Sequence, residues 1–156
     1  MSTQAKLGHN YLVAVDQSKC AEEAFNSVIK AMDHDVDTLC VLSVAEDVSP
    51  TIGAPPYSDV SYIVAANREI EAAARKLLKQ YGEKAKKANV DCTLLLGHGY
   101  PRSVIIEEAT KRQVDEIWIG RRGMSKLKRV FIGSHSRYVI ENAPCTVHVV
   151  HSKEKE

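Results

Sequence analysis

The sequence of 156 residues lacks the features that mark membrane, secreted and metal-binding proteins. It has no apolar run near the roughly 20 residues that a membrane-spanning helix needs. Its first ten residues, MSTQAKLGHN, lack the charged and apolar segments of a secretory signal. Its four cysteines stand singly, with no C-x-x-C pair and no histidine beside them at metal-ligand spacing. We therefore expect a cytoplasmic protein with no membrane contact, whose cysteines are reduced and mostly buried.

The chain also has little net charge and few aromatic side chains. The formal net charge is +1, 26% of the residues are charged, 44% are hydrophobic and 6% are aromatic. These fractions are typical of one soluble globular domain. A nucleic-acid partner is disfavoured, because no aromatic residues interleave with the basic cluster between positions 121 and 129 and the chain as a whole is almost neutral.

Two common nucleotide-binding motifs are absent. A dinucleotide fingerprint needs G-x-G-x-x-G straight after the first strand, but that position reads VDQSKC. No G-x-x-x-x-G-K-[ST] segment is present either, so the P-loop ATPase and GTPase classes are excluded. If the chain binds a nucleotide, it does so through another arrangement.

Strand-like and helix-like segments alternate along the whole chain. Short apolar runs predict strands, and apolar residues at helical spacing predict helices between them. The expected strands are 11–15, 38–44, 91–97, 116–120 and 145–151, and the expected helices are 19–32, 62–88, 102–112 and 133–142. The proline-rich segment 46–61 is expected to be a loop. This alternation predicts a parallel sheet with helices on both faces and a ligand site beyond the carboxyl ends of the strands.

Glycines and basic residues gather after the fourth expected strand. Gly120 is followed after two residues by Gly123 and after nine more by Gly133 and Ser134. A glycine at a strand end lets the backbone approach a ligand closely, because it has no Cβ. A helix starting near Gly133 offers unpaired N–H groups and positive dipole charge to an anion, and Ser134 could both cap that helix and donate to a phosphate. The nearby arginines and lysines could screen phosphates, bind nucleic acid or keep the loop soluble.

This G-2x-G-9x-G-[ST] spacing resembles the nucleotide-binding signature of the universal stress protein family. The resemblance extends over nearly the whole chain, through YLVAVDQS at 11–18, LSVAED at 42–47, GHGYP at 97–101 and ENAPCTVHVV at 141–150. It implies one domain over residues 8–152 with flexible tails at 1–7 and 153–156. Together with the alternation, it predicts an α/β fold with an open parallel five-stranded sheet, Rossmann-like, in the order 3-2-1-4-5.

The resemblance further implies a stress-response sensor or switch that binds ATP, or AMP or ADP, with Mg²⁺ and hydrolyses it slowly at most. Val44 would offer backbone groups to adenine, and Asp16 would lie near the ribose or ligate a phosphate-bound metal ion. The expected contacts are Val15, Asp16, Val44, Gly97, Gly99, Ile119, Gly120, Arg122, Gly123, Gly133, Ser134 and His135. The segment 46–61 would act as a lid over the adenine. A homodimer through residues 145–151 is implied as well, because an apolar last strand would otherwise leave an unpaired edge.

The residues leave other functions open. Gly120 could merely permit a turn, Asp16 could merely cap the next helix, and His135 could face solvent rather than a phosphate. An adenylating or pyrophosphatase-type enzyme would need a glycine- and serine-rich loop where this chain has DQSKC. A module that binds protein partners and no nucleotide remains the main alternative.

Overall fold

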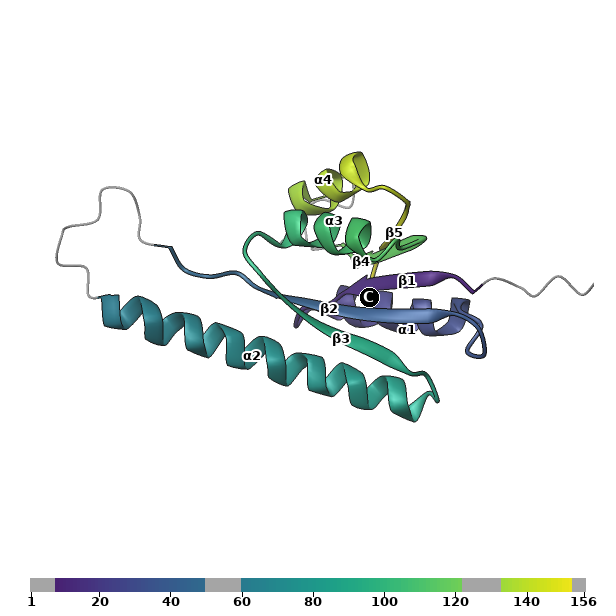
Figure 1. Ribbon diagram of the computed structural model, residues 1–156, viewed down its shortest axis with the longest axis horizontal. Helices are drawn as coiled ribbons and strands as arrows, with labels where there is room; N and C mark the ends of the chain where they lie inside the picture. Colours follow the sequence, from purple (N-terminus) through teal and green to yellow (C-terminus); the bar gives the residue numbers. More distant parts are fainter. Residues whose placement is uncertain (1–7, 50–59, 122–132, 153–156) are drawn as a thin grey trace, which may run out of the picture.

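The computed structural model describes residues 8–49, 60–121 and 133–152, and within them strands and helices alternate strictly (Figure 1). The elements are β1 (Asn10–Ala14), α1 (Lys19–Ala31), β2 (Thr38–Ala45), α2 (Val60–Lys87), β3 (Cys92–His98), α3 (Pro101–Lys111), β4 (Glu116–Gly120), α4 (Ser134–Asn142) and β5 (Thr146–Val150). All the predicted elements are present, and none of their ends differs from the prediction by more than two residues. Among the described residues, no helix is long and apolar enough to cross a membrane.

The strands form one five-stranded sheet in the order β3-β2-β1-β4-β5, and every neighbouring pair is parallel. Helices α1 and α2 cover one face, and α3 and α4 cover the other (Figure 1). The predicted fold class and strand order are therefore confirmed. From β1 the chain adds β2 and then β3 on one side of β1, and it later adds β4 and then β5 on the other side. The direction in which strands are added therefore reverses between β1 and β4. In open parallel sheets, such a reversal opens a crevice at the carboxyl ends of the strands.

Two apolar clusters, one on each face, hold the layers together. On the first face, Phe25 of α1 and Tyr81 of α2 are almost fully buried and meet edge to face, with ring centroids 4.9 Å apart. On the second face, Leu12 and Ile117 from adjacent strands are fully buried beneath α3 and α4. Because the central strands are covered on both sides, they read in the sequence as continuous apolar runs instead of alternating ones.

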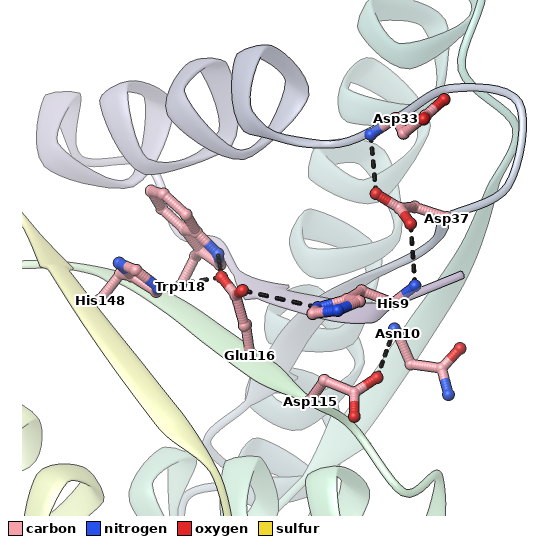
Figure 2. Close-up of polar contacts among 8 residues, drawn as sticks. All are labelled: His9, Asn10, Asp33, Asp37, Asp115, Glu116, Trp118 and His148. Carbon is pink, nitrogen blue, oxygen red and sulfur yellow. Dashed lines mark hydrogen bonds and ion pairs between the residues drawn. The ribbon is translucent and has the colours of Figure 1, made fainter. Parts of the chain in front are cut away.

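Carboxylates fasten the amino ends of the central strands (Figure 2). Asp37 accepts hydrogen bonds from the backbone N–H groups of His9, at 2.8 Å, and Asp33, at 2.7 Å. Asp115 accepts one from the N–H of Asn10, also at 2.8 Å. These bonds satisfy backbone donors at the edge of the sheet opposite the carboxyl ends.

Glu116 joins two histidines and the single tryptophan at the same end of the sheet (Figure 2). Its carboxylate lies 2.9 Å from Nε2 of His148, on the neighbouring strand, and 3.7 Å from Nδ1 of His9. The indole N–H of Trp118 donates to the same carboxylate at 3.3 Å, and its ring stacks on His148 with centroids 4.0 Å apart. The cluster ties β5 to β4 and to the segment before β1.

Some predictions fall outside the described residues: the tails 1–7 and 153–156, most of the expected lid, and the basic loop at 122–132. One detail was wrong. The cysteines are only partly buried, although burial raises the pKa of the thiols of Cys40, Cys92 and Cys145.

Candidate functional site

A cavity of about 550 Å³ lies at the carboxyl edge of the sheet, where the strand order reverses between β1 and β4. Its floor is formed by the ends of β1, β2 and β4, and its walls by α2, α3 and the starts of α1 and α4. The aliphatic part of the lining comprises Ala14, Val15, Ala21, Leu42, Val44, Ile70, Ala73, Ala74, Leu77, Ile105, Ile119 and Val139. Its size and its mostly apolar walls with a few polar groups are those of a small-molecule site.

The cavity brings together residues that are far apart in the sequence and were predicted as a site. The predicted residues that line it are Val15, Asp16, Val44, Ile119, Gly120, Gly133, Ser134 and His135. Arg122 and Gly123 lie outside the described residues. The order of the strands explains the gathering, because the carboxyl ends of β2, β1 and β4 are adjacent.

Gly97 and Gly99 do not line the cavity, although they were predicted to shape it. A Cβ on Gly97 would come within 2.5 Å of Cγ1 of Val104, so this glycine lets α3 pack closely on β3. Gly99 has φ +108°, a conformation that side-chain-bearing residues rarely adopt. Both glycines therefore shape the β3–α3 connection. His98 ends β3 and lies 3.7 Å from a carboxylate oxygen of Asp47.

Gly120 has a different role from those glycines, because it does line the cavity. A Cβ there would lie 2.5 Å from the carbonyl carbon of Cys20 and from the backbone nitrogen of Ala21. The first turn of α1 thus rests directly on the end of β4.

The start of α4 is open toward the cavity, whereas the start of α1 is capped. Ser18 accepts a hydrogen bond from the N–H of Ala21 at 3.1 Å and so caps α1. At α4, Gly133 is the N-cap residue, and no side chain in the described part of the chain caps the helix. Ser134 is the first helical residue, so its expected capping role was wrong. The first N–H groups of α4 have no partner within the helix and line an anion-accepting end of the cavity.

Asp16 follows β1 and lies at the mouth of the cavity. Its carboxylate accepts a hydrogen bond from the N–H of Ser18 at 2.8 Å, which orders the turn into α1. Among the described residues, no group of three or more carboxylate, histidine or cysteine side chains could hold a metal ion by itself. One carboxylate does suit a magnesium ion that a phosphate group brings with it, because Mg²⁺ commonly takes one or two carboxylates plus phosphate oxygens.

Sequence reasoning missed five polar residues of the lining, which are Gln17, Ser18, Ser43, Arg102 and Ser136. Ser43 and Ser136 are almost fully buried, and each brings a hydroxyl group to the cavity. The signal for Ser43 is a polar residue inside the otherwise apolar run TLCVLSVA. Arg102, in the first turn of α3, lies over the ring of Tyr138 with its guanidinium 4.9 Å from the centroid. It is the only lysine or arginine among the described lining residues, and its place at the mouth could not be read from the sequence.

Comparisons with known proteins agree with this architecture. Residues 9–151 match the model of the Universal stress protein family. A Staphylococcus haemolyticus protein named as a universal stress protein is 30% identical over 93% of this chain and 86% of its own length. The universal stress protein UspA from Lactobacillus plantarum is similar in structure, with a TM-score of 0.77 and 26% identity over 94% of this chain and 99% of its own. A family member from Arabidopsis thaliana, solved with AMP bound, has a TM-score of 0.64 and 19% identity, covering 93% of this chain and 92% of its own.

Proposed function

This chain belongs to the universal stress protein family, and we propose that it binds an adenine nucleotide in the cavity between β1 and β4 and acts as a sensor or switch in the response to stress. The observation that carries the proposal is the cavity itself. It joins an aliphatic compartment, suited to a base, to an uncapped helix start, suited to a phosphate. The AMP bound to the Arabidopsis relative supports the same ligand class.

We propose a part of the nucleotide for each region of the lining. Adenine would lie against the end of β2, where Val44 offers its backbone N–H and C=O, and the buried hydroxyl of Ser43 lies beside it. The ribose would approach Asp16, whose carboxylate accepts hydrogen bonds from hydroxyl groups. The phosphates would meet the N–H groups of Ser134 and His135 at the start of α4. ATP with Mg²⁺ is the proposed form, with Asp16 as the metal's protein ligand, and AMP and ADP are the shorter alternatives.

Binding is favoured over rapid hydrolysis. Asp16 and His135 are the only carboxylate and imidazole side chains among the described lining residues. Phosphoryl transfer to water needs an aligned nucleophile together with charge stabilisation at the terminal phosphate. Asp16 already accepts the N–H of Ser18 and orders the turn into α1, so its carboxylate serves the fold as well as the site. We therefore propose slow hydrolysis at most.

The test is a titration of AMP and of ATP with Mg²⁺ into the wild type and the Asp16→Asn variant. Asparagine keeps an oxygen that can accept the Ser18 N–H, so the turn is preserved while the charge is lost. We expect binding to the wild type and a loss of about tenfold or more in the variant, as for one charge-assisted hydrogen bond. Asp91→Asn, on the exposed residue before β3, is the matched control. If neither nucleotide binds the wild type, the partner-binding alternative replaces the proposal.

We also propose a homodimer through β5. This strand is one edge of the sheet, and its valines at 147, 149 and 150 are only partly buried. An apolar edge strand without proline favours pairing with another strand, and a second copy of β5 would satisfy its outward backbone groups. Light scattering should give twice the mass of one chain. A single-chain mass at all working concentrations would contradict the dimer.

A cytoplasmic location is proposed from the state of the cysteines. All four lie in the described part of the chain, and all are free thiols. Reduced thiols are what a glutathione-buffered compartment maintains. Fractionation of cells that express the protein should place it with the cytoplasmic enzymes, and recovery with secreted proteins would contradict this.

A further inference from the structure

A second cleft, of about 430 Å³, opens beside the nucleotide cavity between the start of α1 and the middle of α2. The two hollows share the lining residues Asp16, Gln17, Ser18, Ala73 and Leu77. A ligand in the first cavity can therefore continue into the second past the turn that follows β1. The nucleotide assigned above does not use this space, which is nearly as large as the nucleotide cavity.

Tyr81 lies at the base of the cleft, and an ion pair lies at its end away from the first cavity. Tyr81 lines the cleft and is only 4% exposed, because its ring packs on Phe25 beneath. Lys84 of α2 forms an ion pair with Glu22 of α1 and also lies over the Tyr81 ring, 5.0 Å from its centroid. These residues lie one to two helical turns beyond the junction with the first cavity. The ion pair joins the two helices and limits how far a ligand can reach.

The polar groups of the cleft suit a group rich in hydroxyls better than a bare phosphate. Two carboxylates, Asp16 and Glu22, balance two ammonium groups, Lys76 and Lys84, so the lining has no net charge. The amides of Gln17 and Gln80 can each donate and accept hydrogen bonds, as sugar hydroxyls can. A lone phosphate would find no excess positive charge and would leave most of the volume empty. The carbon skeleton of a sugar can instead lie on Tyr81 and Leu77.

We propose that this cleft binds a sugar joined to the nucleotide through its phosphates, so that the ligand of this protein is a nucleoside diphosphate linked to a sugar. The proposal rests on the nucleotide-binding function proposed above and extends it. Phosphates at the start of α4 would share the first cavity with the turn at residues 16–18, because Gly133 and Ser134 line that cavity together with this turn. The sugar passes this turn and meets Gln80 on α2.

The test compares ADP with ADP-ribose and ADP-glucose by calorimetric titration. We expect at least one of the two sugar nucleotides to bind the wild type about tenfold or more tightly than ADP, as two added hydrogen bonds would give. Gln80→Ala should remove most of that gain and leave ADP affinity within about twofold, because Gln80 lines only the second cleft. Lys79→Ala is the control, since Lys79 is an exposed neighbour on the same helix that lines neither hollow.

The outcomes separate this inference from the function on which it rests. If ADP binds and neither sugar nucleotide binds more tightly, the sugar site is overturned and the nucleotide site stands. If Gln80→Ala still binds a sugar nucleotide about tenfold more tightly than ADP, the placement of the sugar in this cleft is overturned. If none of the three ligands binds, both proposals fail. Gln80 is exposed, so its truncation should not unfold the protein, and circular dichroism of each variant checks this.

Discussion

The contact between Gly120 and the first turn of α1 leads to a sharp prediction about stability. Replacing Gly120 with alanine adds one methyl group at the end of β4. That carbon would lie 2.5 Å from the carbonyl carbon of Cys20 and the nitrogen of Ala21, and 2.7 Å from the Cys20 oxygen. Ordinary van der Waals contact begins near 3.4 Å. Because all three atoms belong to the backbone, no side chain can rotate away, and α1 must move by about 1 Å from a close-packed core.

The expected cost of this movement is about 1–3 kcal/mol, the usual range for overpacking. For a chain of this size, 1 kcal/mol lowers Tm by about 2–4 °C, so the variant should melt about 2–12 °C below the wild type. Gly82→Ala is the matched control, since its Cβ would lie 3.0 Å from Cδ1 of Leu94, a side chain 41% exposed on an edge strand. The exposed Leu94 side chain can move to accommodate the added methyl group. Because alanine favours a helix interior over glycine, Gly82→Ala should raise the free energy of unfolding by about 0.5–1 kcal/mol.

Thermal unfolding followed by circular dichroism or calorimetry measures both variants. Alanine should therefore lower the Tm at position 120 and raise it at position 82. A Gly120→Ala variant that melts within 1 °C of the wild type would show that α1 does not rest on β4 as described. A larger loss for Gly82→Ala than for Gly120→Ala would refute the distinction between backbone and side-chain obstacles.

Two further predictions concern the core beneath α1 and α2. Phe25→Ala should lower the free energy of unfolding by about 3–5 kcal/mol in urea, because it empties a fully buried site, whereas Val36→Ala, at a residue 40% exposed, should change it by less than about 0.5 kcal/mol. Burial, with the carboxylates of Glu22 and Asp16, raises the pKa of Tyr81 from 10.0 to about 12. Between these values only the unfolded chain releases the proton, so stability should fall as pH rises from 10 to 12 and then level off. Tyr81→Phe should remove that slope in urea titrations, and an unchanged slope would mean that the hydroxyl ionises equally in both states.

The secondary structure could be predicted almost completely because its causes are local. Ser18 before α1, Pro101 at the start of α3 and the apolar runs of the strands each act within a few residues. The end of α2 was predicted to within one residue although Gly82 lies inside the helix. Gly82 disfavours a helix by itself, but the buried residues Tyr81 and Ala85 on either side of it pack on the core and continue the helix to Lys87.

The candidate site could be predicted in part. Residues at or just beyond the carboxyl end of a strand, such as Gly120 and Asp16, were found because the carboxyl ends of parallel strands share one edge. Gly97 obeyed the same rule and yet serves packing against Val104. Arg102 and Gln80 were missed, since a polar residue on a helix gives no sign of which neighbour it faces.

The sequence by itself determined the order of strands and helices, the parallel sheet and the glycine pattern after β4, because these depend on periodicity and on residues close together in the chain. Only the tertiary structure decided that α4 begins beside the ends of β1 and β4 with no side chain of the described residues as its cap, and that a second cleft lies between α1 and α2. A cavity is bounded by side chains that meet across the fold. Its shape therefore depends on packing distances of a few ångströms between helices, which a pattern along one chain does not contain.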